Sequence, residues 1–208
     1  MDSRTLWRDS ESTAQACLSH PFLTGIADGT LDRRAFEHYI GQDAFFLDAF
    51  SRAYALGLAH SADQQTMRRF KLLLDGAMDE QALHAGYARS WGVDLHPSPT
   101  AATRAYTDFL LRVAALEPVG NMCAAMTPCM RLYAWLGQQL SSQLSAESAY
   151  REWVQTYGSA EFEALAVVME DLLNQFGGDQ TVISQHYSTA MELELAFFDS
   201  AYLSGEAR

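Results

Sequence analysis

The sequence predicts an all-α protein, a single bundle of seven to eight helices. Apolar residues recur at helical spacing along nearly the whole chain, whereas no stretch alternates apolar and polar residues over the length of a strand. The chain has 208 residues, of which 49% are hydrophobic and 19% charged, which suits one domain with a substantial core. Because no linker or repeat divides the chain, we expect one domain over residues 1–208.

The expected helices are bounded by residues that start or stop helices. His20-Pro21 ends the first one, Ser61-Ala62-Asp63 caps the third, and Trp91-Gly92 ends the third. Breaks within helices are expected near Gly41 and Thr127-Pro128, with Gly76 as a further candidate. The expected helices span 3–19, 30–59, 62–91, 100–115, 118–143, 147–156, 159–176 and 179–203, and the residues between 21 and 29 are expected to form a connection.

Charge and cysteine content exclude several classes of protein. The net charge is −12, and the only short basic cluster is residues 68–71, so the positive stripe needed to bind nucleic acid is missing. No apolar run has the length of a signal peptide or a membrane span, so no membrane partner is expected. The three cysteines lack metal-ligand spacing and indicate reduced thiols in a cytoplasmic protein.

Cys129 is the first candidate for chemistry. It directly follows Pro128, a residue suited to the first turn of a helix, and Tyr133 lies one turn later on the same face. If a helix starts here, the positive end of its dipole would favour the thiolate, the nucleophilic form. The alternative is a small hydrophobic residue packed in the core, which is the commoner role of a single cysteine in an apolar helix.

An acidic residue and several aromatic residues could form a binding pocket. Asp43 stands beside two phenylalanines in an otherwise apolar stretch, where an ionised carboxylate needs partners or a ligand. A place at the solvated edge of the helix is the alternative. Tyrosines on three separate helices could converge on a flat heterocycle, although most such residues only fill a core. These tyrosines are Tyr106, Tyr133 and Tyr157.

The last helix carries three acids. Glu192 and Asp199 are seven residues apart and share a face, so one of them could be a buried acid–base group, whereas Glu194 is expected to point elsewhere. Metal ligation is not expected, because Glu80 and His84 form the only close pair of metal-ligand type and the pair has no second copy.

Five short motifs in order resemble the TenA family over about residues 5–203. The resemblance implies a haem-oxygenase-like helical fold and thiaminase II, or aminopyrimidine aminohydrolase, activity, and the cysteine indicates the cysteine-bearing branch. The motifs are Gln42-Asp43-x-x-Phe46, Ala105-Tyr106, Pro128-Cys129-x-x-x-Tyr133, Thr156-Tyr157-Gly158 and Phe197-Phe198-Asp199-x-Ala201-Tyr202.

The resemblance also implies roles for individual residues. Cys129 matches the nucleophile that adds to the pyrimidine ring, and Asp43 matches the carboxylate that holds the ring nitrogen and amino group. Asp199 stands where the family typically has Glu in an aromatic-aromatic-Glu-x-Ala-Tyr context, and it is expected to be the acid–base group. Phe46 matches a stacking position, and Tyr106, Tyr133 and Tyr157 match pocket tyrosines.

The expected reaction is hydrolysis of a 4-aminopyrimidine that carries a CH2–X group at C5. The resemblance favours the aminomethyl pyrimidine of degraded thiamin over thiamin itself, without a cofactor, in a homotetramer that serves thiamin salvage. Two alternatives stay open: a non-catalytic regulatory protein that binds thiamin-like pyrimidines, and a redox or metal-dependent enzyme on the same fold.

Overall fold

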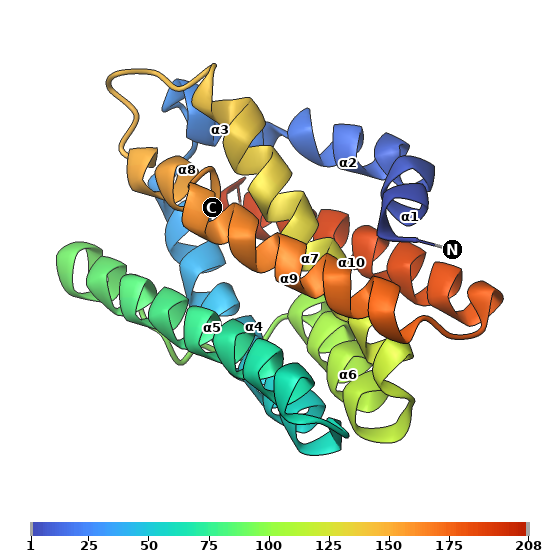
Figure 1. Cartoon of the computed structure of the whole chain (residues 1–208). Helices are drawn as coiled ribbons and strands as arrows, with labels where there is room; N and C mark the ends of the chain where they lie inside the picture. The colour runs from blue at the N-terminus through green and yellow to red at the C-terminus, as the bar shows by residue number, and fades with distance from the viewer. Residues whose placement is uncertain (1, 207–208) are drawn as a thin grey trace.

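The described part of the chain, residues 2–206 of a computed structural model, folds into ten helices (Figure 1). They are α1 (Ser3–Asp9), α2 (Glu11–Leu18), α3 (Pro21–Asp28), α4 (Arg33–His60), α5 (Gln64–Trp91), α6 (Ala101–Leu116), α7 (Val119–Ser141), α8 (Arg151–Tyr157), α9 (Ala160–Phe176) and α10 (Gln180–Glu206). The all-α fold is as predicted, but the expected number of helices is slightly low.

The two additional helices lie near the N-terminus. The expected first helix is divided at Ser10 into α1 and α2. The segment expected as a connection is α3, because Pro21 occupies its first turn and the His20 side chain accepts a hydrogen bond from the Phe22 N–H at 3.1 Å. Gly29, with φ of 84°, then ends α3 in the left-handed conformation that favours glycine.

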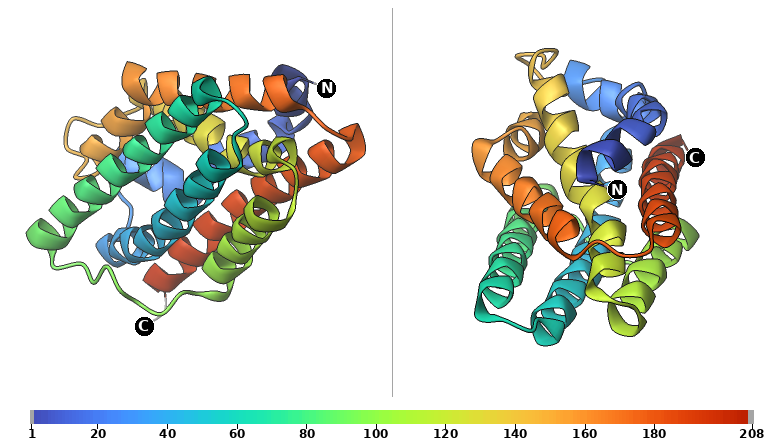
Figure 2. Two further views of the ribbon diagram at one scale, coloured as in Figure 1. Left: turned by 60° about the horizontal axis from the view of Figure 1, so that its bottom comes forward. Right: turned by 45° about the vertical axis from the view of Figure 1, so that its right-hand side comes forward.

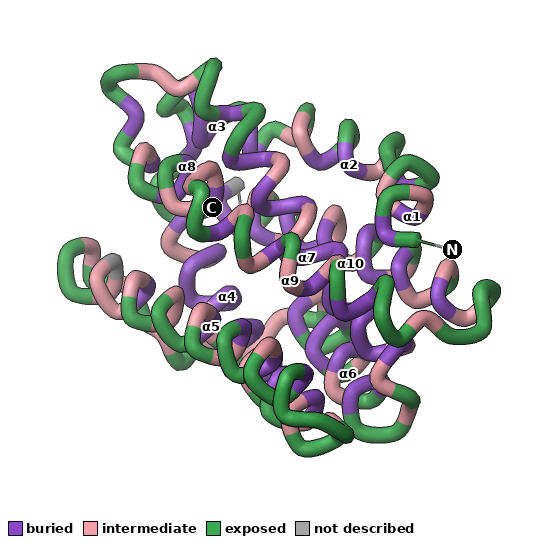
Figure 3. Tube along the Cα trace, in the orientation of Figure 1, coloured by how far each residue is buried: buried purple, intermediate pink, exposed green. Residues whose placement is uncertain are grey.

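None of the expected breaks interrupts its helix: α4, α5 and α7 run through Gly41, Gly76 and Pro128. At Gly41 the reason for glycine is space, since a Cβ there would lie 2.8 Å from the Asp94 carbonyl oxygen. Pro128 leaves the carbonyl of Ala124 without its usual intrahelical donor. The helix continues nonetheless, because α7 is buried over most of its length and packing outweighs local propensity (Figure 3).

Two helices organise the packing. α7 contacts α8, α9 and α10, whereas α4 contacts α5, α6 and α10, and α5 also contacts α9 (Figure 2). Side chains of α4, α5, α7 and α9 therefore face a common interior. Among the described helices, none is both long enough and apolar enough to cross a bilayer.

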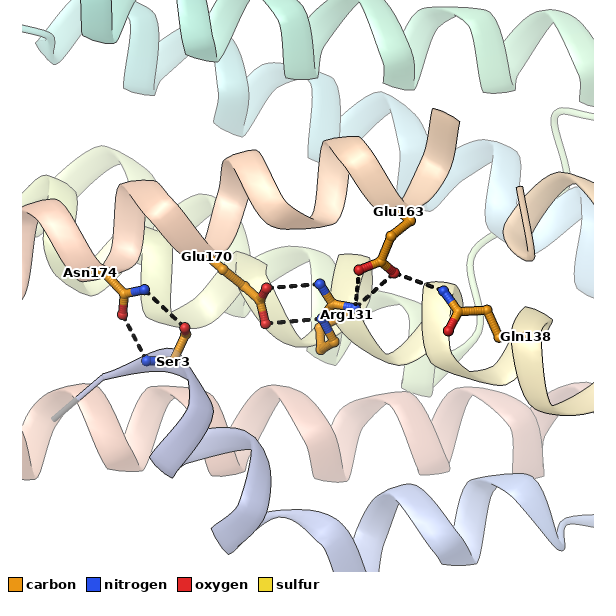
Figure 4. A network of polar contacts seen from close by, with 6 residues as sticks. All are labelled: Ser3, Arg131, Gln138, Glu163, Glu170 and Asn174. Carbon is orange, nitrogen blue, oxygen red and sulfur yellow. Dashed lines mark hydrogen bonds and ion pairs between the residues drawn. The ribbon is translucent and has the colours of Figure 1, made fainter. Parts of the chain in front are cut away.

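A polar network fixes α9 to α7 (Figure 4). Arg131 of α7 donates to Glu170 through Nε and Nη2, at 2.9 and 2.8 Å, and to Glu163 through Nη1, at 2.9 Å. Gln138, two turns further along α7, donates to the same Glu163 at 2.8 Å. Multiple charge-assisted hydrogen bonds of this kind hold the orientation of the two helices as well as their distance.

A close backbone approach fixes the end of α8. A Cβ at Gly137 of α7 would lie 2.2 Å from the backbone nitrogen of Gly158 and 2.4 Å from the carbonyl carbon of Tyr157. Only glycine lets the two backbones meet at this distance. The position of Tyr157 at the end of α8 therefore depends on Gly137.

Candidate active site

A nearly closed cavity lies among α4, α5, α7, α8 and α9. It has about 10 Å³ open to a water-sized sphere, which is room for roughly one water molecule. Five residues expected in the site line it: Cys129, Asp43, Phe46, Tyr133 and Tyr157. The other lining residues are Leu47, Phe50, Glu80, Met130 and Phe162.

Aromatic rings form much of the wall of this inner cavity. The rings of Tyr133 and Tyr157 lie 4.8 Å apart between centroids, and Phe162 meets Tyr157 edge-on at 5.0 Å. On α4, Phe46 stacks with Phe50 at 5.2 Å. Such walls suit a flat heterocycle, which aromatic side chains contact through their faces and edges.

Cys129 lies in the middle of α7 and is 9% exposed. Because α7 begins at Val119, the expected effect of a helix N-terminus on this thiol is absent. Burial raises the pKa of Cys129 well above its usual range, and neighbouring carboxyl groups, Glu194 first, raise it further. The resting residue is therefore a protonated thiol, and forming the thiolate requires a base.

Glu194 supplies a carboxyl group behind the thiol. It is 1% exposed, accepts a hydrogen bond from the Tyr106 hydroxyl at 2.7 Å, and interacts with the Cys129 thiol. Burial raises the pKa of Glu194 to about 7. Tyr106, a predicted pocket tyrosine, does not line this cavity in the structure, and its hydroxyl holds Glu194; its contact with the substrate stays a prediction.

Asp43 lines the inner cavity, and its Oδ2 lies next to His84. Its side chain is 5% exposed, and among the described residues its Oδ2 has no hydrogen-bond partner. His84 Nε2 lies 3.3 Å from this oxygen, and burial lowers the pKa of His84 to about 4, which keeps the imidazole neutral. Burial also raises the pKa of Asp43 well above its usual range, and the carboxyl groups of Glu80 and Glu194 add to the effect.

Glu80 separates the inner cavity from a second hollow. Its Oε1 accepts a hydrogen bond from the Tyr157 hydroxyl, and burial raises its pKa to about 7. An outer pocket of about 240 Å³ lies on the other side, between α5 and the start of α9. Glu80 and Phe162 line both spaces, so these two side chains stand between the inner cavity and the outer pocket.

We expected Glu192 and Asp199 of α10 to share a face with one of them buried, and this placement is wrong. Asp199 is on the surface, with a side chain that is 61% exposed and an Oδ1 that lies 3.0 Å from His20 Nε2. Glu192 is exposed as well, whereas Glu194, which was expected to point elsewhere, faces the thiol. The buried stripe of α10 passes through Tyr187, Ala190 and Glu194, and Asp199 is out of phase with it.

Asp43, Glu80 and His84 could also hold a metal ion. One ligand atom each of Asp43, Glu80 and His84 lies within 4.8 Å of the others. The sequence showed Glu80 and His84 only as an isolated pair, and the fold brings them next to Asp43. The same three groups, a neutral imidazole near two carboxyl groups whose pKa values are raised, also suit the exchange of protons.

The residues that sequence reasoning missed follow a simple pattern. Glu80, which is half-buried, is in phase with the buried residues Phe70, Leu73 and Ala77 of α5, at helical intervals of three and four. Glu194 is likewise in phase with the buried residues of α10. The spacing of an acidic residue within an apolar stripe could therefore have predicted that both residues face the interior.

The family model of the TENA/THI-4/PQQC family matches residues 7–203, and the chain therefore belongs to that family. The aminopyrimidine aminohydrolase of Halalkalibacterium halodurans is 31% identical over 210 residues, which cover 95% of this chain and 94% of the relative. The aminopyrimidine aminohydrolase of Helicobacter pylori is 30% identical, and the match covers 97% of this chain and 99% of the relative. A TenA homologue from Pyrococcus furiosus has the same fold, with a TM-score of 0.91 over 97% of this chain and 100% of the homologue at 23% identity.

Proposed function

We propose that the protein hydrolyses thiamin-related 4-aminopyrimidines through a covalent adduct on Cys129. The observation that supports this most is the arrangement of the inner cavity. A buried thiol, backed by the Glu194 carboxyl group, lines the same small aromatic space as the Asp43 carboxyl group. The relatives named aminopyrimidine aminohydrolase favour the same reaction.

The roles of the residues follow from this arrangement. Asp43 holds the ring nitrogen and the 4-amino group of the pyrimidine, which favours ring protonation and makes C6 electrophilic. The Cys129 thiol gives its proton to Glu194, and its sulfur bonds to C6. The C–X bond at the exocyclic carbon then breaks, water adds to the resulting methylene, and the sulfur leaves C6 and takes back the proton.

The substrate that we propose is the aminomethyl pyrimidine, which would give hydroxymethyl pyrimidine and ammonia. Thiamin, which would release its thiazole, is the second substrate to test. The three free cysteines suit a reducing compartment, so we place the reaction in the cytoplasm, as a step of thiamin salvage. The homotetramer that the resemblance implies stays a prediction, to be measured by light scattering.

Replacement of Cys129 tests the proposal. The Cys129→Ser variant should lose release of ammonia from aminomethyl pyrimidine while it still binds the hydroxymethyl product, because the change is nearly isosteric. Cys17→Ser and Cys123→Ser are the matched controls; both residues are buried away from the inner cavity and should leave turnover intact.

Parallel product analysis with thiamin and the aminomethyl pyrimidine identifies the substrate. Turnover by Cys129→Ser at the wild-type rate would exclude the covalent mechanism. Binding without turnover in the wild type would favour the alternative of a non-catalytic pyrimidine-binding protein, which the protonated resting thiol would suit.

A further inference from the structure

The inner cavity and the outer pocket meet at one ionisable side chain, Glu80. A ring held by Asp43 and attacked by Cys129 occupies the inner cavity. Its departing group must leave toward a space large enough to receive it, and the outer pocket, at about 240 Å³, adjoins the inner cavity through Glu80 and Phe162. An exocyclic group that points from the ring toward the outer pocket would therefore lie beside Glu80.

The other acidic residues considered for the site either have another role or lie on the surface. Glu194 does not line the inner cavity; it contacts the thiol and the Tyr106 hydroxyl from behind. Asp43 does line it, but its carboxyl group is the ligand expected for the ring nitrogen and amino group. The two acids expected from the sequence, Asp199 and Glu192, are exposed.

Tyr157 holds Glu80 in this position. The hydroxyl at the end of α8 donates to Glu80 Oε1, and the Tyr157 ring is in contact with Tyr133 and Phe162. A side chain held by a hydrogen bond at the boundary of a closed cavity is suited to proton transfer, because both its distance and its orientation are fixed.

We propose that Glu80 is a further catalytic residue, the base that activates the water molecule added after the leaving group departs. This role rests on the proposed function. The aminomethyl group leaves as ammonia from its ammonium form, and the carbon–nitrogen electron pair goes with the nitrogen. Glu80 takes a proton from water while the water oxygen bonds to the exocyclic methylene, and it then passes that proton to the departing ammonia, which becomes ammonium.

The Glu80→Gln variant separates the two halves of the reaction. Adduct formation and loss of ammonia do not need this base, so the variant should release a burst of about one equivalent of ammonia per site and then stop. Mass spectrometry should find the pyrimidinylmethylene group on the peptide that contains Cys129. Steady-state kcat should fall by about 10²–10⁴-fold, the usual contribution of a general base.

Azide provides a readout that a structural role would not affect. It is a nucleophile without a proton to lose, so it should restore turnover of Glu80→Gln and give the azidomethyl pyrimidine. The Glu80→Asp variant should recover part of the kcat without azide. Asp75→Asn is the control, since Asp75 is an exposed acid of the same helix, paired with Lys71, and should leave kcat unchanged.

The outcomes distinguish this role from the proposed function. Absence of turnover in the wild type would overturn the proposed function and the role of Glu80 with it. Normal wild-type turnover together with a Glu80→Gln kcat within about threefold of wild type would overturn the Glu80 role alone. A large loss of kcat without an ammonia burst and without rescue by azide would also overturn it, because Glu80 would then support only the structure.

Discussion

Replacing Glu194 with Gln should change how stability depends on pH. Burial raises the pKa of Glu194 from 4.5 to about 7 in the folded protein, whereas the unfolded chain keeps the ordinary value. The group therefore stays protonated in the folded state at pH values where the unfolded chain ionises. Its contribution to stability is complete below pH 4.5 and is lost as the pH rises through about 7.

The size of the change follows from the same two values. A rise from 4.5 to about 7, at about 1.4 kcal/mol per pH unit, corresponds to about 3 kcal/mol of stability lost by the wild type at high pH. Gln does not titrate and has the shape of the protonated acid. Because part of this loss falls outside the range, the free energy of unfolding of Glu194→Gln relative to wild type should rise by about 2.5 kcal/mol between pH 5 and pH 8.

Urea unfolding at several pH values measures this difference. Glu192→Gln is the matched control, because Glu192 is an exposed acid on the same helix and its variant should follow the wild type at every pH. A difference between Glu194→Gln and wild type that stays constant from pH 5 to pH 8 would contradict the reasoning, since it would mean that Glu194 titrates normally in the folded protein.

Two further predictions concern the ring-binding group and the backbone around the cavity. Asp43→Asn should weaken binding of the hydroxymethyl pyrimidine by about 1.5–3 kcal/mol, because a charge-assisted hydrogen bond is lost; unchanged affinity in calorimetry would place Asp43 outside the binding site. Gly137→Ala should destabilise the fold by about 2–3 kcal/mol in urea unfolding, because its Cβ would overlap the backbone at Gly158. Its control is Gly86→Ala, where the added Cβ meets nothing within 4 Å and should be neutral or stabilising.

The helical spacing of apolar residues predicted the all-α fold class correctly. It did not predict the continuity of single helices, which depends on tertiary contacts. Gly41 and Pro128 were read as breaks because their local propensity opposes a helix. Burial of α4 and α7 outweighs that propensity, and the burial of a helix can be judged only from the three-dimensional packing. The division between α1 and α2 could not be predicted for another reason: Ser10 is not a strong helix breaker.

The candidate site was predicted in part. Cys129 and Asp43 were found because each is a polar or reactive residue in an apolar stretch, and both line the inner cavity. Asp199 was chosen because it stands where the family typically has Glu, and Glu192 was the competing candidate. Of the three acids, only Glu194 is in phase with the buried stripe of α10. The contact of Glu80 with Tyr157 joins residues 77 positions apart, and spacing within a single helix cannot predict such a contact.

The small size of the inner cavity has a consequence for the kinetics of binding. A space with room for roughly one water molecule cannot admit a pyrimidine ring, so the ligand must bind a more open form in which side chains such as Phe162 have moved. The measured affinity then equals the intrinsic affinity multiplied by the fraction of molecules that are open. Two relatives with identical contacts to the ring could thus differ in affinity solely because one opens more often. Replacements on α9 that never touch the ligand would be expected to alter its rate of association.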